Sequence, residues 1–432
     1  MNSKNAKQPT ICLVAADVSG DQSGARLAAA IGELCPDAKL IAAGGPALRE
    51  AGVEVLVETG EASMVGPPGS LKSARALLRV WRELCHTIDA RQPDLAVLID
   101  NETLNLLLAR RLRRQEVPTA FFFPPQVWFW GRWRIRWIVR LSMRILCAFK
   151  QEADLYQDAG ADALWTGHPL RDVVSVREDA DAAMRAVALD PDRPLVVLMP
   201  GSRPQEVSYH SPLMAEVAQI LQARNPALQF AVPLASETLR EQVEHQFGAR
   251  GLRDLSIYIP RSYAILSRAR AVLQCSGTAT IEAALLGIPS TIIYRCSRLH
   301  YAVARRFMHV KFIGMPNLLL GEMVQPEFFG TRLEPERLAA ELTALLQDEA
   351  RRSYIKRRLT ELPDLLGPTG AIKRAALSVV EMLPLTSRSR EAPEPSVVAA
   401  AFKAPNSARS RRYVDRVPQP SRVGPGQRRD PV

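Results

Sequence analysis

The chain has 432 residues, of which 47% are hydrophobic and 23% are charged. This composition is typical of a globular protein of about two or three domains, and it excludes a wholly disordered protein and a disulfide-rich miniprotein. The six cysteines form no CxxC pair and no Cys/His cluster with zinc spacing, so we expect no disulfide framework, no structural metal and a reducing compartment.

The N-terminal stretch MNSKNAKQPTICLVAAD lacks the charged start, apolar core and cleavage site of a secretory signal, so we expect no export. No stretch is apolar for long enough to span a membrane, because the best candidate, 135–149, is interrupted by three arginines. The formal net charge of +11 would suit nucleic acid, anionic lipid or phosphorylated substrates.

Much of this charge lies in the last residues. The stretch 387–432 holds ten Lys or Arg, four acidic residues and seven prolines, and so carries +6 of the +11. Because such a composition cannot bury enough apolar surface to offset chain entropy, we expect a disordered basic tail. The remaining body carries only +5, which does not by itself indicate a nucleic-acid binder.

Short apolar runs alternate with helical patterns through most of the chain. The first half contains ICLVAA, LIAAGG, LAVLID, PTAFFF and RILCAF, with helices expected at about 22–34, 71–90, from 102 and from 153. The second half contains LVVLMP, LQFAVPL, LSIYI, AVLQCS and STIIY. Its helices are expected at about 205–223, around residue 237 and from residue 279 onwards. Apolar runs that are continuous rather than alternating predict parallel sheets buried on both faces.

The two sets of elements predict an α/β protein with two doubly wound, Rossmann-like domains that face a cleft. The expected organisation is a first domain over 1–170, a connection over 171–194, a second domain over 195–348, C-terminal helices over 349–386 and the tail over 387–432.

One strand-to-helix turn of the second half has the chemistry of a phosphate site. LVVLMP is followed by Gly201, Ser202 and Arg203, and a helix opens near Glu206. Glycine lets the backbone approach a ligand, the helix start offers N–H groups to an anion, and arginine offers a two-pronged contact to phosphate. The alternative is a tight turn with a solvated arginine.

A second turn repeats this pattern. AVLQC leads into Ser276, Gly277 and Thr278, which could meet a diphosphate at the start of a helix. Glu282, one turn later, could accept hydrogen bonds from a ribose diol or be a surface charge. Asn317 follows a proline in a loop that would return to the same cleft, where turn chemistry is the alternative to ligand contact.

Acidic residues follow two strands of the first half. Ser19 and Asp21 come after ICLVAA, and Asp100 and Glu102 come after LAVLI. Residues just past the carboxyl ends of parallel strands face the ligand crevice of a doubly wound sheet. The alternative for Asp21 and for Asp100 is a helix N-cap.

The segment 128–137 contains four of the six tryptophans and three arginines. Its Trp130, Trp133 and Trp137 suit a lipid headgroup boundary, where half-wet aromatic rings and cations meet anionic lipid. The alternatives are a domain-packing helix and stacking on single-stranded nucleic acid.

In their order these motifs resemble the lipid-A-disaccharide synthase family, inverting glycosyltransferases of the GT-B fold. The resemblance covers about residues 10–345, and the matching segments are Ser19-Gly20-Asp21, Gly44-Gly45-Pro46, Ile99-Asp100 with Asn105-Leu106, Val127-Trp128-Phe129-Trp130, Gly167-His168-Pro169-Leu170, Pro200-Gly201-Ser202-Arg203 with Glu206, Ser276-Gly277-Thr278-Ala279 with Glu282, Pro316-Asn317 and Pro326-Glu327.

The resemblance implies transfer of a 2,3-diacylglucosamine from UDP to the 6-hydroxyl of 2,3-diacylglucosamine 1-phosphate, without a metal or a cofactor. It implies a first domain on the acceptor side and a second that binds UDP. The expected UDP site is formed by Gly201, Ser202, Arg203, Ser276, Gly277, Thr278, Glu282 and Asn317.

On the acceptor side Asp100 matches the position of a base, and further candidate substrate contacts are Ser19, Asp21, Glu102 and His168. For His168 the alternative is a structural hinge. The expected location is cytoplasmic, peripheral to the inner face of the cytoplasmic membrane; a homodimer is left open, and no nucleic-acid partner is expected.

The chain departs from the family pattern mostly on the acceptor side. Asp17 stands where the family usually has Glu, and IDNETLN replaces IDAPDFN, which brings Glu102 within two residues of Asp100. The alternatives are therefore a UDP-sugar epimerase or hydrolase, a paralogue with another acyl-sugar acceptor, and a non-catalytic nucleotide-binding descendant.

Overall fold

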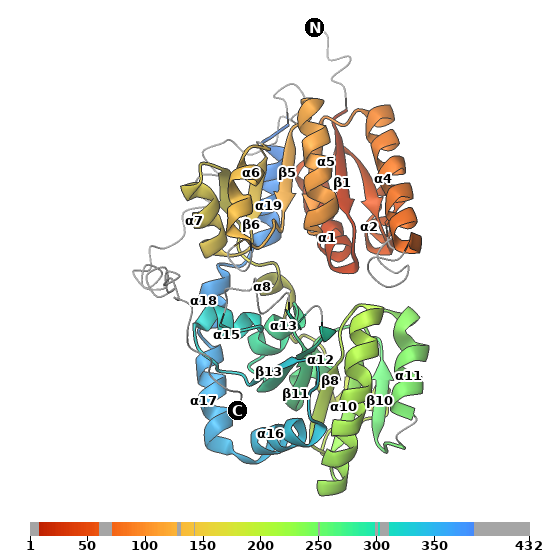
Figure 1. Ribbon diagram of the computed structural model, residues 1–432, viewed down its shortest axis with the longest axis vertical. Coiled ribbons are helices and arrows are strands. Elements are labelled where there is room, and N and C mark those ends of the chain that lie inside the picture. The colour runs from red at the N-terminus through yellow and green to blue at the C-terminus, as the bar shows by residue number, and fades with distance from the viewer. Residues whose placement is uncertain are drawn as a thin grey trace.

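The computed structural model describes residues 8–59, 71–127, 131–141, 143–248, 251–298, 301–302 and 311–383, with backbone alone for 71–77 and 132. Strands and helices alternate along these residues and build two parallel sheets, one above the other in Figure 1. The basic tail predicted over 387–432 lies outside the described residues.

The first sheet has seven strands in the order β3-β2-β1-β4-β5-β6-β7, and every neighbouring pair is parallel. The strands are β1 (Thr10–Ala15), β2 (Lys39–Gly44), β3 (Glu54–Glu58), β4 (Leu95–Ile99), β5 (Thr119–Phe122), β6 (Arg144–Cys147) and β7 (Asp162–Trp165).

Helices cover both faces of this sheet, which is why its central strands are continuous apolar runs. One face packs on α1 (Val18–Leu34) and α2 (Pro46–Glu50). The other face packs on α4 (Leu71–Arg91), α5 (Glu102–Arg114), α6 (Ile135–Val139) and α7 (Lys150–Asp158). A short 3-10 helix, η1 (Arg132–Arg134), leads into α6.

The second sheet has six parallel strands in the order β10-β9-β8-β11-β12-β13. They are β8 (Leu195–Met199), β9 (Gln229–Pro233), β10 (Leu255–Tyr258), β11 (Ala269–Cys275), β12 (Ser290–Arg295) and β13 (Glu327–Gly330). One face packs on α10 (Pro204–Arg224), α11 (Arg240–Gly248), which follows η2 (Glu237–Leu239), and α16 (Pro335–Gln347). The other face packs on α9 (Ala180–Ala186), α12 (Ala264–Ser267) and α13 (Ala279–Leu285).

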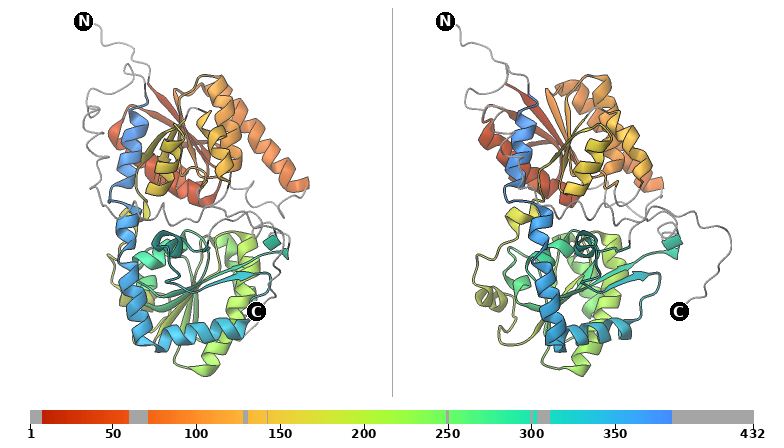
Figure 2. Two further views of the ribbon diagram at one scale, coloured as in Figure 1. Left: turned by 60° about the vertical axis from the view of Figure 1, so that its left-hand side comes forward. Right: turned by 90° about the vertical axis from the view of Figure 1, so that its left-hand side faces the viewer.

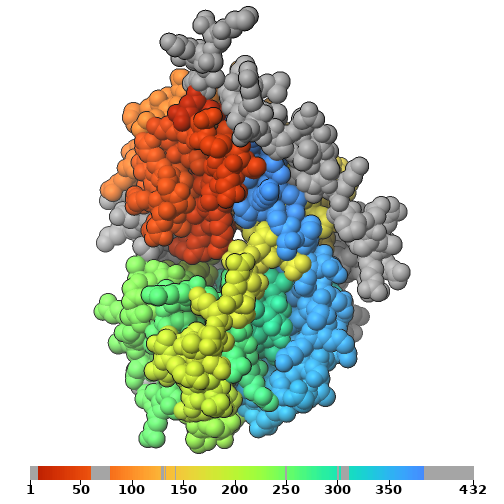
Figure 3. All heavy atoms as spheres, turned by 180° about the vertical axis from the view of Figure 1, so that it is seen from behind, coloured from red at the N-terminus to blue at the C-terminus, as the bar shows by residue number. Residues whose placement is uncertain are grey.

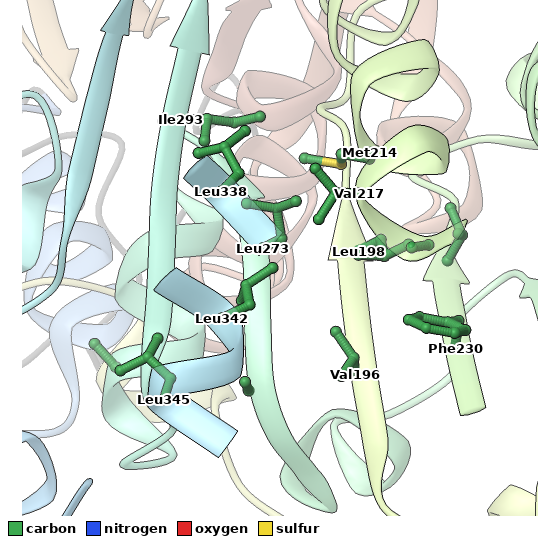
Figure 4. Packing of buried hydrophobic residues seen from close by; sticks show 14 of the residues in the cluster. Val196, Leu198, Met214, Val217, Phe230, Leu273, Ile293, Leu338, Leu342 and Leu345 are labelled. Carbon is green, nitrogen blue, oxygen red and sulfur yellow. The ribbon is translucent and has the colours of Figure 1, made fainter. Parts of the chain in front are cut away.

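Figure 4 shows how helical spacing produces the core of the second sheet. Leu338, Leu342 and Leu345 recur on one side of α16 and lie against Leu273 and Ile293 of the sheet. All three leucines have no exposed surface. Because burying a leucine side chain stabilises a fold by about 1.5–3 kcal/mol, this stripe fixes α16 on the sheet.

The chain crosses between the two sheets twice. The first crossing runs through α8 (Leu170–Val173) to α9, and the return runs through α17 (Glu349–Leu359) and α18 (Leu362–Leu366), which lies near α15 (Met315–Leu320), to α19 (Ala371–Val380). Figure 2 shows the returning helices beside both sheets, and Figure 3 shows both crossings from behind. Ala375, Ala376 and Val379 of α19 are buried in the core of the first sheet.

The two crossings are held together by Arg374 of α19. Its guanidinium donates to the carbonyl oxygens of Thr166 (2.9 Å), Pro368 (2.7 Å) and Thr369 (2.7 Å). The division into domains at 170, 195 and 348 stays a prediction. None of the described helices is long and apolar enough to cross a bilayer.

Candidate active site

Both sheets reverse their strand order at a central pair of strands, β1 with β4 and β8 with β11. Loops leave such a pair in opposite directions, so a crevice opens at the carboxyl ends of the strands. Asp17 and Asp100 follow the first pair, and Arg203 and Ser276 follow the second. Asp17 and Arg203 approach within 4.0 Å, so the two crevices face each other.

Asp17, Ser19 and Asp100 form a hydrogen-bonded group at the first crevice. The Ser19 hydroxyl lies 3.2 Å from Asp17 Oδ1 and 3.2 Å from Asp100 Oδ2. Asp17 is the N-cap of α1 and accepts a hydrogen bond from Gly20 N at 2.8 Å. The helix therefore begins at Val18, before the expected position 22, and Asp21 lies inside it rather than at its cap.

The backbone at Asp100 is held in a left-handed conformation. Asp100 and Asn101 have φ angles of 54° and 33°, in a region that few residues other than glycine, asparagine and aspartate adopt. The buried Asn105 amide holds this turn by donating to the carbonyl oxygens of Ile99 (3.0 Å) and Asp100 (2.8 Å). Asn101, not Asp100, is the N-cap of α5, so the carboxylate of Asp100 is not used for capping.

The electrostatic surroundings make Asp100 a better proton acceptor than an ordinary aspartate. Burial raises the pKa of Asp100 to about 6, and the nearby charge of Asp17 acts in the same direction. The Asn101 N–H, the Ser19 hydroxyl and Arg203 act in the opposite direction. A carboxylate whose pKa lies near neutrality is suited to general base catalysis.

Glu102, the second acid after β4, has different surroundings. Its Oε2 lies 2.9 Å from Nη1 of Arg134, which is itself largely buried. The carboxylate is thus paired with a cation at the start of α5.

Asp21 is buried and turned towards α2. Its carboxylate accepts hydrogen bonds from Gly45 N (2.7 Å), Ala47 N (2.8 Å) and Leu48 N (3.4 Å). A Cβ atom at position 45 would lie 2.8 Å from Asp21 Oδ2. The Ser-Gly-Asp and Gly-Gly-Pro motifs are therefore the two sides of one contact that fixes α2, and we place Asp21 behind the crevice.

At the second crevice the backbone amides after Gly201 already have an acceptor. Ser202 N and Arg203 N donate to Glu206 Oε2 at 3.1 and 3.3 Å. Gly201 has φ of 124°, and a Cβ atom there would lie 2.6 Å from Glu206 Oε2. The expectation that these amides stand free for an anion is therefore wrong in this structure, and glycine is needed for the approach of Glu206.

The Arg203 side chain remains accessible in the crevice. It is 67% exposed, and its guanidinium lies 3.4 Å from Glu206 Oε1 and 4.0 Å from Asp17 Oδ2. Ion pairs of this exposure are weak, so the guanidinium can turn to an incoming anion at little cost.

The turn after β11 offers a more open surface. Gly277 and Thr278 are exposed, and a Cβ atom at position 277 would meet nothing within 4 Å. The Ser276 hydroxyl donates to Ile313 O at 2.7 Å and keeps its lone pairs as acceptors. Burial raises the pKa of Glu282, while a hydrogen bond from Tyr263 and the charge of Arg26 oppose this shift.

Asn317 lies behind this turn. It is fully buried, its amide group donates to Gln325 O (2.6 Å) and Glu327 Oε1 (2.7 Å), and its oxygen accepts from Val324 N and Gln325 N at 2.9 Å. Glu327 in turn accepts from the amides of Ile313 and Gly314. The Asn317 side chain therefore supports the loop that contacts Ser276 and does not reach the crevice.

His168 lies at the first crossing between the sheets. It is buried against Phe123 and Phe149, and its Nδ1 accepts from Leu170 N at 3.2 Å. Its backbone N–H donates to Leu366 O at 2.8 Å, on the returning segment. Burial lowers the pKa of His168 to about 4, so the ring is neutral at pH 7. These contacts match the structural alternative for this residue.

His210 was not predicted from the sequence, although it supports the loop that carries Arg203. Its Nδ1 lies 3.0 Å from Pro200 O, and Arg295 N donates to its Nε2 at 2.9 Å. The ring thus carries its proton on Nδ1 and joins the ends of β8 and β12. A histidine inside α10 gives no local signal of this role, because its partners lie outside the helix, and Arg295 is 85 residues away in the sequence.

Of the three tryptophans proposed as membrane contacts, two are exposed in the structure. Trp133, in η1, is 79% exposed, and Trp137, in α6, is 39% exposed. Trp130 lies outside the described residues.

Two doubly wound parallel sheets, with Asp100 at one crevice and the exposed Arg203 at the crevice that faces it, form the architecture of the GT-B fold. A glycosyltransferase from Rickettsia africae shows the same fold, with a TM-score of 0.51 and 11% identity over 88% of this chain and 100% of that one. The model of the lipid-A-disaccharide synthetase family matches residues 11–376, and the chain belongs to this family.

Individual relatives agree with this assignment. The lipid-A-disaccharide synthase of Myxococcus xanthus is 36% identical over 87% of this chain and 98% of its own length. That of Geobacter sulfurreducens is 38% identical over 86% of this chain and 97% of its own length. The family resemblance, the two-domain fold type and the glycosyltransferase activity predicted from the sequence are thereby confirmed.

Proposed function

We propose that the chain transfers a 2,3-diacylglucosamine from its UDP donor to the 6-hydroxyl of 2,3-diacylglucosamine 1-phosphate, which yields the lipid A disaccharide 1-phosphate and UDP. Family membership supports this reaction. The structural observation that carries it is the position of Asp100 after the central strand pair of the first sheet, opposite Arg203 after the central strand pair of the second.

In the proposed step the acceptor oxygen attacks the anomeric carbon while its proton passes to the Asp100 carboxylate. The bond between the anomeric carbon and the diphosphate oxygen breaks, and its electron pair leaves with UDP. Arg203 meets the charge that develops on the leaving diphosphate. Attack opposite the leaving group inverts the anomeric centre, and the proposal involves no metal ion or cofactor.

The proposed donor site combines the loop after β8 with the turn after β11. Arg203 contacts the diphosphate, Ser276 and Thr278 offer hydroxyl groups, and Glu282 accepts from the ribose. Gly201 and Ser202 shape the first loop, Gly277 leaves room at the second, and Asn317 acts through the loop behind it.

On the acceptor side Ser19 and Glu102 border the crevice beside Asp100. Asp21 and His168 contribute to this side through the positions of α2 and of the first crossing.

The acyl chains of both substrates place the reaction at a lipid surface. We propose peripheral binding to the inner face of the cytoplasmic membrane, with the exposed Trp133 and Trp137 as contacts. Rings that are part wet and part apolar are typical of the headgroup boundary, and the nearby arginines suit anionic lipid. A homodimer is compatible with the proposal.

A product assay with both acylated substrates tests the proposal, with Asp100→Asn as the matched inactive control. We expect disaccharide and UDP in equal amounts. UDP without disaccharide would indicate a hydrolase, and an isomerised UDP-sugar would indicate an epimerase. Turnover only with a different acyl-sugar acceptor would indicate a paralogue, and UDP binding without turnover would indicate a non-catalytic descendant.

A further inference from the structure

The Ser19 hydroxyl has two carboxylate acceptors but only one proton to donate. Asp17 Oδ1 and Asp100 Oδ2 both lie 3.2 Å from Ser19 Oγ. When the hydroxyl donates to one carboxylate, its lone pairs face the other. Such an arrangement joins the two acids into one unit, because the state of each depends on the hydrogen bond made by the other.

The position of Asp17 is fixed independently of Asp100. Its Oδ1 accepts from Gly20 N at 2.8 Å, and a Cβ atom at position 20 would lie 2.9 Å from that oxygen. The side chain is only 13% exposed. Its other oxygen, Oδ2, faces Arg203 across the crevice at 4.0 Å.

A continuous series of contacts therefore runs from the proposed base to the proposed diphosphate contact. Its members are Asp100, Ser19, Asp17 and Arg203. Among the described residues, the charged groups that act on Asp100 are Asp17 from the loop after β1 and Arg203 from the loop after β8. Glu102 is engaged by Arg134. The negative charge of Asp17 and the positive charge of Arg203 act on Asp100 in opposite directions.

We propose that Asp17 is a positioning residue of the transfer reaction, which acts on Asp100 through the Ser19 hydroxyl and through its charge. Arg203 balances this charge until the donor diphosphate engages the arginine. The inference rests on the proposed role of Asp100 as the base. Donor binding then neutralises the charge of Arg203 that faces Asp17. Asp100 thereby becomes a stronger proton acceptor when the leaving group is in place.

Three substitutions test this inference through the pH dependence of the single-turnover rate with both acylated substrates. Asp17→Asn keeps the helix cap, because Asn caps as well as Asp, but removes the charge. We expect the acid limb of its rate profile to move to lower pH by about one unit. Asp17→Glu keeps the charge and restores the residue usual in the family, so its limb should stay close to that of the unmodified protein.

Ser19→Ala removes a hydrogen bond that favours the charged form of Asp100, so its limb should move to higher pH, opposite to that of Asp17→Asn. The matched control is Glu33→Gln, which removes an exposed charge from the same helix and should leave the limb in place. A merely structural role of Asp17 would lower the rate without moving the limb.

An unmoved limb in Asp17→Asn, with Asp100→Asn inactive, would overturn the inference and leave Asp100 as the base. Full activity of Asp100→Asn would instead overturn the assignment of the base. Should Asp17→Asn fail to fold, Asp17→Ser, which also caps a helix but carries no charge, takes its place: a limb moved to lower pH supports the inference, and an unmoved limb overturns it.

Discussion

Glu102 Oε2 lies 2.9 Å from the Arg134 guanidinium, so the second acid after β4 is neutralised by a cation that Asp100 does not share. This pairing separates two carboxylates that are only two residues apart. Glu102 belongs to a partly buried ion pair, whereas burial raises the pKa of Asp100. The two acids are therefore expected to differ sharply in catalysis.

Asp100→Asn should lower the single-turnover rate by about 10²–10⁴-fold, the usual contribution of a positioned general base, with UDP affinity unchanged. Glu102→Gln should retain most of the rate and lower the free energy of unfolding by about 1–3 kcal/mol, because the ion pair between Glu102 and Arg134 is lost. A normal rate in Asp100→Asn, together with collapse in Glu102→Gln, would move the base to Glu102.

Arg203→Ala should weaken UDP binding by about 1.5–3 kcal/mol, the range for a hydrogen bond to a charged group. Arg203→Lys should restore the affinity only in part, because the two-pronged geometry is lost. Isothermal titration calorimetry measures both, and Arg224→Ala, which removes an exposed arginine paired with Glu336, is the matched control. Equal UDP affinity of Arg203→Ala and the unmodified protein would remove Arg203 from the site.

Replacement of both Trp133 and Trp137 by Ala should reduce sedimentation with anionic vesicles and leave UDP affinity intact, because both rings are exposed. Ile259→Ala, a change of an exposed apolar residue on the second half, should have no such effect. Unchanged vesicle binding with a lowered melting temperature would favour a packing role for the tryptophans.

His168 should make stability depend on pH. Its pKa falls from an ordinary value of 6.5 to about 4 on burial, so the unfolded chain binds a proton at pH values where the folded chain does not. Stability is then fully present above 6.5 and is lost as the pH falls towards 4, with a loss of about 2 kcal/mol between pH 7.5 and 5.

Urea unfolding at pH 7.5 and 5 measures this contribution when His168→Asn is compared with the unmodified protein, because the other titrating groups are common to both. The variant keeps an acceptor near Leu170 N but cannot titrate. An identical pH dependence in the two proteins would show that the buried ring carries no such penalty.

The sequence determined the central strands of both sheets, because strands buried on both faces are continuous apolar runs. It did not reveal β3, β7 and β13, which all lie at sheet edges. Strands at an edge have partly exposed positions occupied by residues such as Glu54, Glu58 and Asp162, so their apolar pattern is interrupted.

The order of the motifs also determined the family, but not what each motif does. Only the tertiary structure shows that Asp21 and Gly45 are two sides of one contact, that Asn317 donates to Glu327, and that Glu206 accepts from the amides after Gly201. These partners come from separate elements, and local patterns do not report which elements meet.

Asp100 shows the same limit at the site itself. Its place after a buried strand could be inferred from the sequence, because the carboxyl ends of parallel strands face the crevice. Its link through Ser19 to Asp17 and the approach of Arg203 depend on contacts between segments about 80 and about 190 residues apart. The tertiary structure decided these features, because hydrogen bonds and charge interactions act over a few ångströms in space whatever the separation along the chain.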